Sequence, residues 1–264
     1  MTDDNQAQAA RIIADHRLQR RALPPLPAPL RPANERAGYA LQDRVHALLT
    51  ADGSGPIVGH KIGCTTKVMQ AFLAIENPCA GGVFASTVHT SPARVAHADF
   101  VRVGVECEMV VRLDRDLPFE SAPFTRAGVA AAVGALMAGM EIVDERYTDF
   151  KTLGTPTLIA DDFFDAGCVV GAPLTDWQAL DLATLTGTTS INETEVGRGR
   201  GADVMGHPFE ALAWLANTLA QRGRSLRAGE FVFTGSVVET KWLDPGDAVK
   251  MTIENVGTVE AVFE

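Results

Sequence analysis

Residues 101–113 read VRVGVECEMVVRL, and this stretch decides the fold. Its side chains alternate with a period of two, which is the spacing of a β-strand. One face carries Glu106 and Glu108 between Arg102 and Arg112. The other face consists of apolar side chains and a thiol: Val101, Val103, Val105, Cys107, Met109, Val111 and Leu113. This apolar face predicts a strand that lies well inside a domain built on a β-sheet.

The two glutamates of this strand point to the same side, with Cα atoms about 6.6 Å apart. Two like charges on an interior face repel each other, and burying each ion costs several kcal/mol. A divalent cation would remove both penalties, and carboxylate oxygens favour Mg²⁺ or Mn²⁺ over zinc. The spacing alone leaves an alternative, in which the face is exposed and Arg102 and Arg112 pair with Glu106 and Glu108.

Further polar residues stand at apolar positions elsewhere in the chain. Lys61 lies in PIVGHKIG, which predicts a strand in which this lysine either reaches the surface or is buried for a purpose. A buried ammonium requires an anion, and desolvation lowers its pKa towards the range useful in catalysis. Glu141, Asp144 and Glu145 follow an apolar run and are either a polar helix end or additional ligands.

The remaining elements are predicted from periodicity, proline and glycine. Helices are expected at residues 5–21, 34–49, 125–140 and 207–222, with a proline-rich connector before the second helix. Strands are expected around Lys61 and in the last 35 or so residues. The order of helices and strands is not a regular β-α-β alternation, so a mixed α+β fold is predicted. We divide the chain into a helical segment, 1–52, and a main domain, 53–264.

A glycine-rich stretch, GRGRGADVMG at residues 197–206, superficially resembles a phosphate-binding loop. It lacks the Gly-Lys-Ser/Thr ending, and its spacing differs from the dinucleotide-binding pattern. A flexible loop before the last helix is therefore predicted.

Composition excludes several classes of function. The formal net charge of -10 argues against a nucleic-acid partner, because phosphate binding requires clustered lysine and arginine. The N-terminus lacks the apolar core of a signal peptide, and no apolar run is long enough to span a bilayer. The four cysteines have no C-x-x-C spacing, which indicates reduced thiols rather than zinc ligands or disulfides. A cytoplasmic protein without a membrane partner is expected.

Several motifs together resemble one known family. They are GYALQDRV (38–45), GHKIGCTT (59–66), VECEMVVRL (105–113), MEIVDERY (140–147), VMGHPFEALAWLANTL (204–219) and LDPGDAVKMTIENVGTVEAVF (243–263). From about Ala37 to the C-terminus the chain resembles the 2-oxopent-4-enoate hydratase and 4-oxalocrotonate decarboxylase group of the fumarylacetoacetate hydrolase superfamily. The resemblance implies an α+β fold, a mixed β-roll with flanking helices, in a homo-oligomer, and makes residues 53–264 the catalytic domain.

The resemblance also implies a metal site that binds Mg²⁺ or Mn²⁺. Glu106 and Glu108 match the Glu-x-Glu pair of the family. Glu141 matches its third acid, with Asp144 as the fallback. The catalytic lysine of the family falls on Lys61.

Expected substrate contacts include two departures from the family pattern. Ser236, in FTGSVV, falls where the family has a polar loop beside the substrate. Cys79 stands where the hydratases carry an aspartate, and Phe164 adds aromatic bulk in the run ADDFFD (160–165). Asp161, Asp162 or a water would have to replace the missing acid.

The function implied is that of a lyase acting on a small 2-oxo or 2-hydroxydienoic acid, as in aromatic-compound degradation. Hydration of the acid 2-hydroxypenta-2,4-dienoate and decarboxylation of the 4-oxalocrotonate type share an enolate intermediate, so the sequence does not separate them. One alternative is a carbon–carbon bond hydrolase acting on an acylpyruvate, whose His-Glu pair finds no convincing match around residues 35–46. Another is a non-catalytic assembly partner of an active paralogue.

Overall fold

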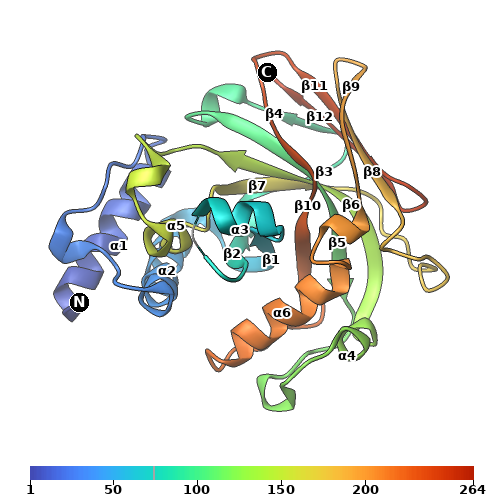
Figure 1. Ribbon diagram of the computed structural model, residues 1–264. Helices are drawn as coiled ribbons and strands as arrows, with labels where there is room; N and C mark the ends of the chain where they lie inside the picture. Colours follow the sequence, from blue (N-terminus) through green and yellow to red (C-terminus); the bar gives the residue numbers. More distant parts are fainter. Residues whose placement is uncertain (74) are drawn as a thin grey trace.

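The computed structural model describes residues 1–73 and 75–264 (Figure 1). Within them, one sheet has seven strands in the order β2-β1-β10-β5-β6-β7-β3, and another has five in the order β4-β12-β11-β8-β9. The strands of the larger sheet are β1 (Ile57–Gly63), β2 (Cys79–Phe84), β3 (Val88–Thr90), β5 (Val103–Leu113), β6 (Val133–Asp144), β7 (Asp165–Val170) and β10 (Phe231–Trp242). Those of the smaller sheet are β4 (Ala93–Val95), β8 (Thr186–Ile191), β9 (Thr194–Arg200), β11 (Ala248–Ile253) and β12 (Gly257–Phe263).

The helices are α1 (Asp3–Leu18), α2 (Glu35–Leu49), α3 (Lys67–Leu73), α4 (Arg126–Ala130), α5 (Thr155–Ala160) and α6 (Pro208–Ala220). In Figure 1, α1, α2 and α5 lie together at one side of the molecule, away from the five-stranded sheet. Three of the four predicted helices are confirmed as α1, α2 and α6. Together with the two sheets they confirm the mixed α+β class.

Strand β5 lies between β6 and β10 in the middle of the larger sheet. Of its residues only Arg112 is exposed, which confirms the interior strand predicted from the alternation. Its apolar face packs against the five-stranded sheet, where the Cys107 thiol donates to the Thr188 carbonyl of β8 at 3.7 Å. The opposite face, with Glu106 and Glu108, therefore points away from that sheet.

The helix predicted at residues 125–140 is wrong. Only the short α4 forms there, and the chain then continues as β6, paired with β5 on one side and β7 on the other. A strand buried on both faces reads as a continuous apolar run without alternation, so alanine and glycine suggested a helix. The small residues serve close sheet packing instead. A Cβ on Gly139 would lie 2.3 Å from Val110 Cγ2 and 2.6 Å from Phe233 Cε1.

The flexible loop predicted at residues 197–206 is also wrong over its first half. Gly197 and Gly199 lie in β9, which pairs with β8. The glycines allow close approach of neighbouring backbone, because a Cβ on Gly199 would lie 1.7 Å from the Val237 carbonyl oxygen.

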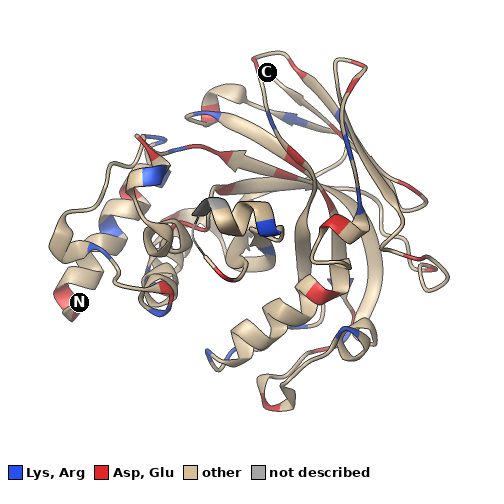
Figure 2. Cartoon of the chain, viewed as in Figure 1, with Lys and Arg blue, Asp and Glu red and all other residues tan. Residues whose placement is uncertain are grey.

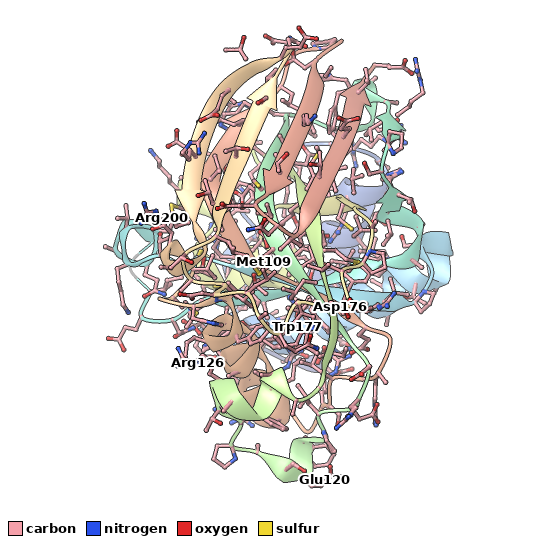
Figure 3. All side chains as sticks on the ribbon, turned by 90° about the vertical axis from the view of Figure 1, so that its right-hand side faces the viewer. Met109, Glu120, Arg126, Asp176, Trp177 and Arg200 are labelled. Atoms are coloured by element: carbon pink, nitrogen blue, oxygen red, sulfur yellow. The ribbon has the colours of Figure 1, made fainter. Side chains whose placement is uncertain are left out.

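Trp177, labelled in Figure 3, packs edge-on against Phe209 of α6, with ring centroids 5.3 Å apart.

Arg17 joins α1 to the rest of the chain. Its guanidinium lies 2.8 Å from Asp162 Oδ2 and 3.4 Å from Asp165 Oδ2, and both carboxylates are fully buried. His46 of α2 lies 2.7 Å from the other oxygen of Asp162. Burial alone would raise the pKa of Asp162, but His46 and Arg17 hold that pKa below its ordinary value. The division of the chain at residues 52 and 53 stays a prediction.

We expect Arg17→Met to lower the free energy of unfolding by about 3–5 kcal/mol, because it removes the guanidinium from the buried carboxylates of Asp162 and Asp165, and His46 contacts only Asp162. Urea denaturation at neutral pH measures this loss. Arg11→Met, at an exposed position of the same helix, is the matched control and should stay within about 0.5 kcal/mol of the wild type. Equal stability of the two variants would contradict the role given to Arg17.

Charged residues are distributed over many elements. Figure 2 shows acidic and basic residues interspersed on helices and strands, in a chain whose formal net charge is -10. Within the described ranges, no helix combines the length and the apolar content that crossing a membrane requires. The absence of a nucleic-acid partner stays a prediction.

Candidate metal centre and active site

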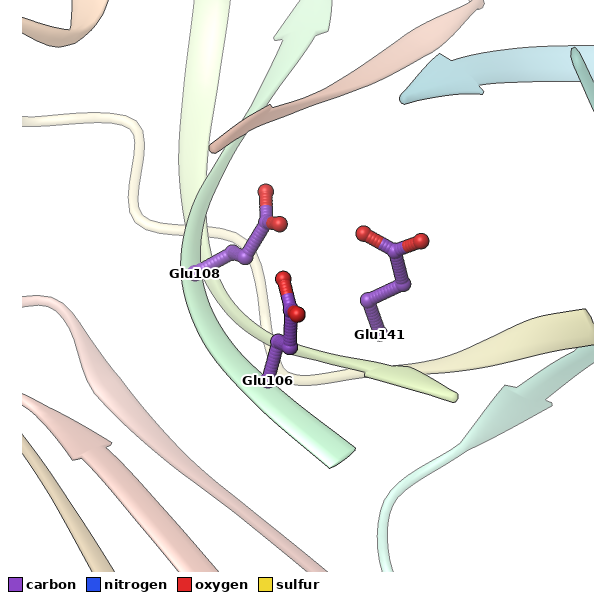
Figure 4. A group of neighbouring side chains, drawn as sticks. All are labelled: Glu106, Glu108 and Glu141. Atoms are coloured by element: carbon purple, nitrogen blue, oxygen red, sulfur yellow. The ribbon is translucent and has the colours of Figure 1, made fainter. Parts of the chain in front are cut away.

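Three glutamates from two neighbouring strands converge on one point (Figure 4). Glu106 and Glu108 follow the two-residue repeat of β5, and the antiparallel register of β5 and β6 places Glu141 directly opposite Glu106. One carboxylate oxygen from each residue lies within 4.8 Å of the others. Glu108 and Glu141 are at most 1% exposed. The three residues expected to hold a metal are thus brought together from positions distant in sequence.

The electrostatics of this cluster are unfavourable without a cation. Burial, followed by repulsion from Glu141, raises the pKa of Glu106 to about 7. The same two causes raise the pKa of Glu108 well above its ordinary value. Glu106 accepts a hydrogen bond from Thr240 Oγ1, and Glu108 Oε2 accepts one from the Gly235 amide at 2.7 Å.

One carboxylate oxygen of the cluster is left unsatisfied by the described residues. Glu108 Oε1 is buried and has no hydrogen-bond partner among the described residues. A buried acceptor without a donor costs free energy, which a bound cation would recover. Three converging carboxylates are the hard oxygen ligands that a divalent cation prefers. The residues present therefore fit such an ion.

Lys61 provides the one positive charge that touches the cluster among the described residues. It is 3% exposed in β1, and its Nζ lies 2.9 Å from Glu141 Oε1 and donates to the Phe163 carbonyl at 2.9 Å. Burial alone would lower the pKa of Lys61, but Glu141, Glu106 and Asp165 together raise it above the ordinary value. The lowered pKa expected from the sequence is thus wrong for the metal-free protein, because the glutamates act as counterions.

Strand β10 bends where it meets the cluster. Gly235 has φ +121°, a conformation that favours glycine, and its amide points at Glu108. The register of β10 with β5 shifts on either side of Ser236, which lies opposite Glu108. Ser236 lies in β10, one of the strands expected near the C-terminus, at an irregularity rather than in the polar loop that the resemblance implied, and its hydroxyl donates to the Val238 carbonyl.

A cavity of about 620 Å³ opens beside these residues. Lys61, Glu106, Ser236 and Phe164 all line it. Four residues expected at the site thus reach this cavity, while Glu108 and Glu141 lie behind its wall as members of the glutamate cluster.

Cys79 does not line the cavity. It is fully buried at the start of β2, and its thiol contacts that of Cys64, which together with burial raises the pKa of Cys79. Cys64 lines the cavity in its place. Cys79 therefore does not reach the cavity, and Cys64 lies between it and the cavity.

The other acids considered from the sequence are engaged elsewhere. Asp161 accepts from Arg146 Nε at 2.8 Å, and Asp162 is held by Arg17 and His46; neither lines the cavity. Asp144 accepts from the Arg102 amide at 2.8 Å. It stands three positions after Glu141 and so points to the opposite face of β6. Asp144 is therefore not part of the cluster of three glutamates.

Two residues near the cluster had no sequence signal of their own. Asp165 is fully buried, and its Oδ1 has no hydrogen-bond partner among the described residues. Burial and Glu141 raise the pKa of Asp165 well above its ordinary value. Thr240 donates to Glu106 from β10. For Asp165 the only hint was its place in the run ADDFFD (160–165), and Thr240 had none.

Comparison with known proteins identifies the family. Residues 74–264 match the fumarylacetoacetate (FAA) hydrolase C-terminal family. The 2-keto-4-pentenoate hydratase of Paraburkholderia phymatum is 31% identical over 100% of this chain and 99% of its own. The 2-hydroxyhexa-2,4-dienoate hydratase of Comamonas testosteroni is 35% identical over 83% of each.

A solved structure matches the whole fold. The 4-oxalocrotonate decarboxylase of Pseudomonas putida G7, complexed with magnesium and adipate, superposes with a TM-score of 0.93 at 26% identity, over 100% of this chain and 99% of that chain. The resemblance read from the motifs is confirmed, as is the β-roll fold class that it implied. This chain belongs to the fumarylacetoacetate hydrolase family.

Proposed function

We propose that this protein is a divalent-cation-dependent lyase that adds water to a small 2-hydroxydienoic acid. The observation that carries the proposal is the buried cluster of Glu106, Glu108 and Glu141, paired with Lys61 at the wall of the cavity. The names of two relatives, both hydratases of short 2-oxo or 2-hydroxydienoic acids, support the same reaction class. A role in aromatic-compound degradation follows as part of this proposal.

With 2-hydroxypenta-2,4-dienoate as the substrate, the atoms balance as follows. A proton is added at C5 while the enol proton leaves, the hydroxyl of water adds at C4, and a proton is added at C3, which gives 4-hydroxy-2-oxopentanoate. Mg²⁺ or Mn²⁺ held by the three glutamates would supply the positive charge that stabilises negative charge on the 2-oxygen. Lys61 Nζ holds or moves a proton at this oxygen or the neighbouring carbon, because it is the ammonium that faces both the cluster and the cavity.

The hydrolase alternative finds no support in the segment where its His-Glu pair was sought. Residues 35–46 lie in α2. Glu35 accepts from Asn77 at 3.0 Å, and His46 pairs with Asp162. Neither residue lines the cavity, so neither is placed to activate water there.

The test is turnover by the protein purified alone. We expect 2-hydroxypenta-2,4-dienoate to lose its conjugated absorbance with Mg²⁺ and to keep it with a chelator, and mass spectrometry should detect the hydrated product. Release of CO₂ from 4-oxalocrotonate, without hydration of the dienoate, would replace hydration by decarboxylation. Inactivity on both acids and on acylpyruvates would favour the non-catalytic assembly partner. Cytoplasmic location and a homo-oligomer are proposed together with this function.

Metal binding should weaken below neutral pH. The pKa of Glu106 is raised to about 7 in the metal-free protein, so below pH 7 a cation must displace its proton. The Kd for Mn²⁺ should therefore rise as the pH falls below 7, by about tenfold per pH unit for each proton displaced. Calorimetric titrations from pH 5.5 to 8.5 measure this slope. Glu106→Gln should reduce the slope, and an equal Kd at pH 5.5 and 8.5 would contradict the cluster as the binding site.

A further inference from the structure

The part of the cavity wall that follows Lys61 is aromatic. Phe163 and Phe164 line it, and the Phe164 ring packs edge-on against Tyr147 and Phe150, with centroids 4.9 and 5.6 Å away. Phe150 and Trp242 also line the cavity. An aromatic surface of this kind stabilises a ligand by burying apolar area.

This aromatic wall is held by the fold at a conformational cost. Phe163 and Phe164 have φ values of +52° and +71°, which are uncommon for bulky residues. The Phe163 amide donates to the Leu158 carbonyl at 2.8 Å, and the Phe164 carbonyl accepts from the Asp144 amide at 2.9 Å. The Phe163 carbonyl also accepts from Lys61. Strained backbone that persists beside a reactive group indicates that the two rings are positioned for function.

The mouth of the cavity is apolar as well. Val68 and Met69 of α3 are 78% and 42% exposed, and Trp242 is 39% exposed. All three line the cavity. Large apolar side chains exposed at the rim of a cavity are typical of a surface that a ligand covers. At about 620 Å³ the cavity lies within the roughly 300–1,000 Å³ that drug-sized ligands occupy, and a five-carbon acid would fill only a part of it.

The charges along the cavity argue against a second carboxylate on the substrate. Among the described lining residues the cations are Lys61 and Arg102. Lys61 pairs with Glu141, and Arg102 pairs with Glu145 while it lies over the Trp242 ring at 4.2 Å. The remaining charged residues of the lining are carboxylates: Glu106, Glu145, Asp203 and Glu239. A carboxylate at the far end of a substrate would meet repulsion there and no unengaged cation among these residues.

We propose that the substrate is a 2-hydroxydienoate with one carboxylate and an extended apolar or aryl group at C5. This rests on the proposed hydration. The carboxylate end lies at the cation site beside Lys61, and the C5 group contacts Phe164, Phe163 and Trp242. That group takes part in no bond that forms or breaks. Its contacts therefore affect which substrate is selected and not the chemical steps.

The first test measures binding of unreactive 2-oxo acids in the presence of Mg²⁺. We expect 2-oxo-5-phenylpentanoate to bind about tenfold more tightly than 2-oxopentanoate, and 2-oxoadipate at least about tenfold more weakly. Equal Kd values, or a Kd that is lowest for 2-oxoadipate, would overturn the inference. Because binding needs no turnover, this result is separate from success or failure of the hydration assay.

The second test replaces aromatic residues that line the cavity. For the aryl substrate 2-hydroxy-5-phenylpenta-2,4-dienoate, Trp242→Ala at the exposed rim should reduce kcat/KM about tenfold, and for the five-carbon parent less than about threefold. Phe164→Ala should do the same, with circular dichroism to verify folding. Phe119→Ala, which removes an exposed ring outside the cavity lining, is the control. Equal losses on both substrates in Trp242→Ala would show that the wall does not select the C5 group.

Discussion

Replacing Glu108 with glutamine is expected to lower the kcat/KM value for the Mg²⁺-loaded enzyme at least about a thousandfold, or about 4 kcal/mol. The substitution keeps the size of the side chain but removes the negative charge from a residue that is fully buried between Gly235 and the other glutamates. A neutral amide is a weak ligand for a hard cation. Steady-state kinetics over a range of Mg²⁺ concentrations would show whether the loss lies in metal affinity, in kcat or in both.

The same variant should be more stable than the wild type without metal. Burial, followed by repulsion from Glu141 and Glu106, raises the pKa of Glu108, and glutamine removes the charge on which both of these costs fall. Thermal denaturation with a chelator should give a higher Tm for Glu108→Gln, and added Mg²⁺ should raise it less than in the wild type. Glu120→Gln, at an exposed position labelled at the edge of Figure 3, is the matched control and should change neither quantity. Wild-type activity of Glu108→Gln would rule out the glutamate cluster as the catalytic metal site.

How much of the site could be predicted from the sequence depends on how far apart along the chain the interacting residues are. Glu106 and Glu108 are two residues apart, and a local two-residue repeat is enough to place both on one face. Glu141 joins them through the register of β5 and β6, which is a long-range property. Periodicity suggested a helix just before Glu141, so the residues alone gave no reason to place it opposite Glu106. Only the resemblance to a family linked the three.

The aromatic wall and the role of Arg17 could not be predicted from local sequence patterns either. The directions of Phe163 and Phe164 follow from positive φ angles, which no local signal for bulky residues predicts. Arg17 reaches Asp162 across a long stretch of sequence, as an ion pair buried within the assembled fold. Cys79 was considered because of its place in a motif, yet its side chain points towards Cys64 rather than the cavity. A position in a motif identifies a neighbourhood, and side-chain direction decides the contact.

Replacing Lys61 with methionine is expected to reduce kcat by about 10²- to 10⁴-fold, the range typical of losing a positioned proton-transfer group. Methionine fills a similar volume but carries no ammonium, so both the proton and the charge beside Glu141 are lost. Metal affinity should stay equal or increase, because a competing cation has been removed from the cluster. Exchange of the C3 protons in 2-oxopentanoate with deuterated water, followed by NMR, measures the proton-transfer step directly and should fall with kcat.

Two further variants separate catalysis from charge balance. Lys250→Met, at an exposed position of β11, should behave as the wild type. Lys61→Arg restores the positive charge without an amine that readily gives up its proton, so it should restore stability in the metal-free protein but not kcat. If Lys61 served only as the counterion of Glu141, its replacement would matter without metal and become silent once Mg²⁺ is bound. A metal-loaded Lys61→Met enzyme with normal kcat and normal exchange would establish that lesser role, whereas slow exchange at full metal occupancy would assign the proton to Lys61.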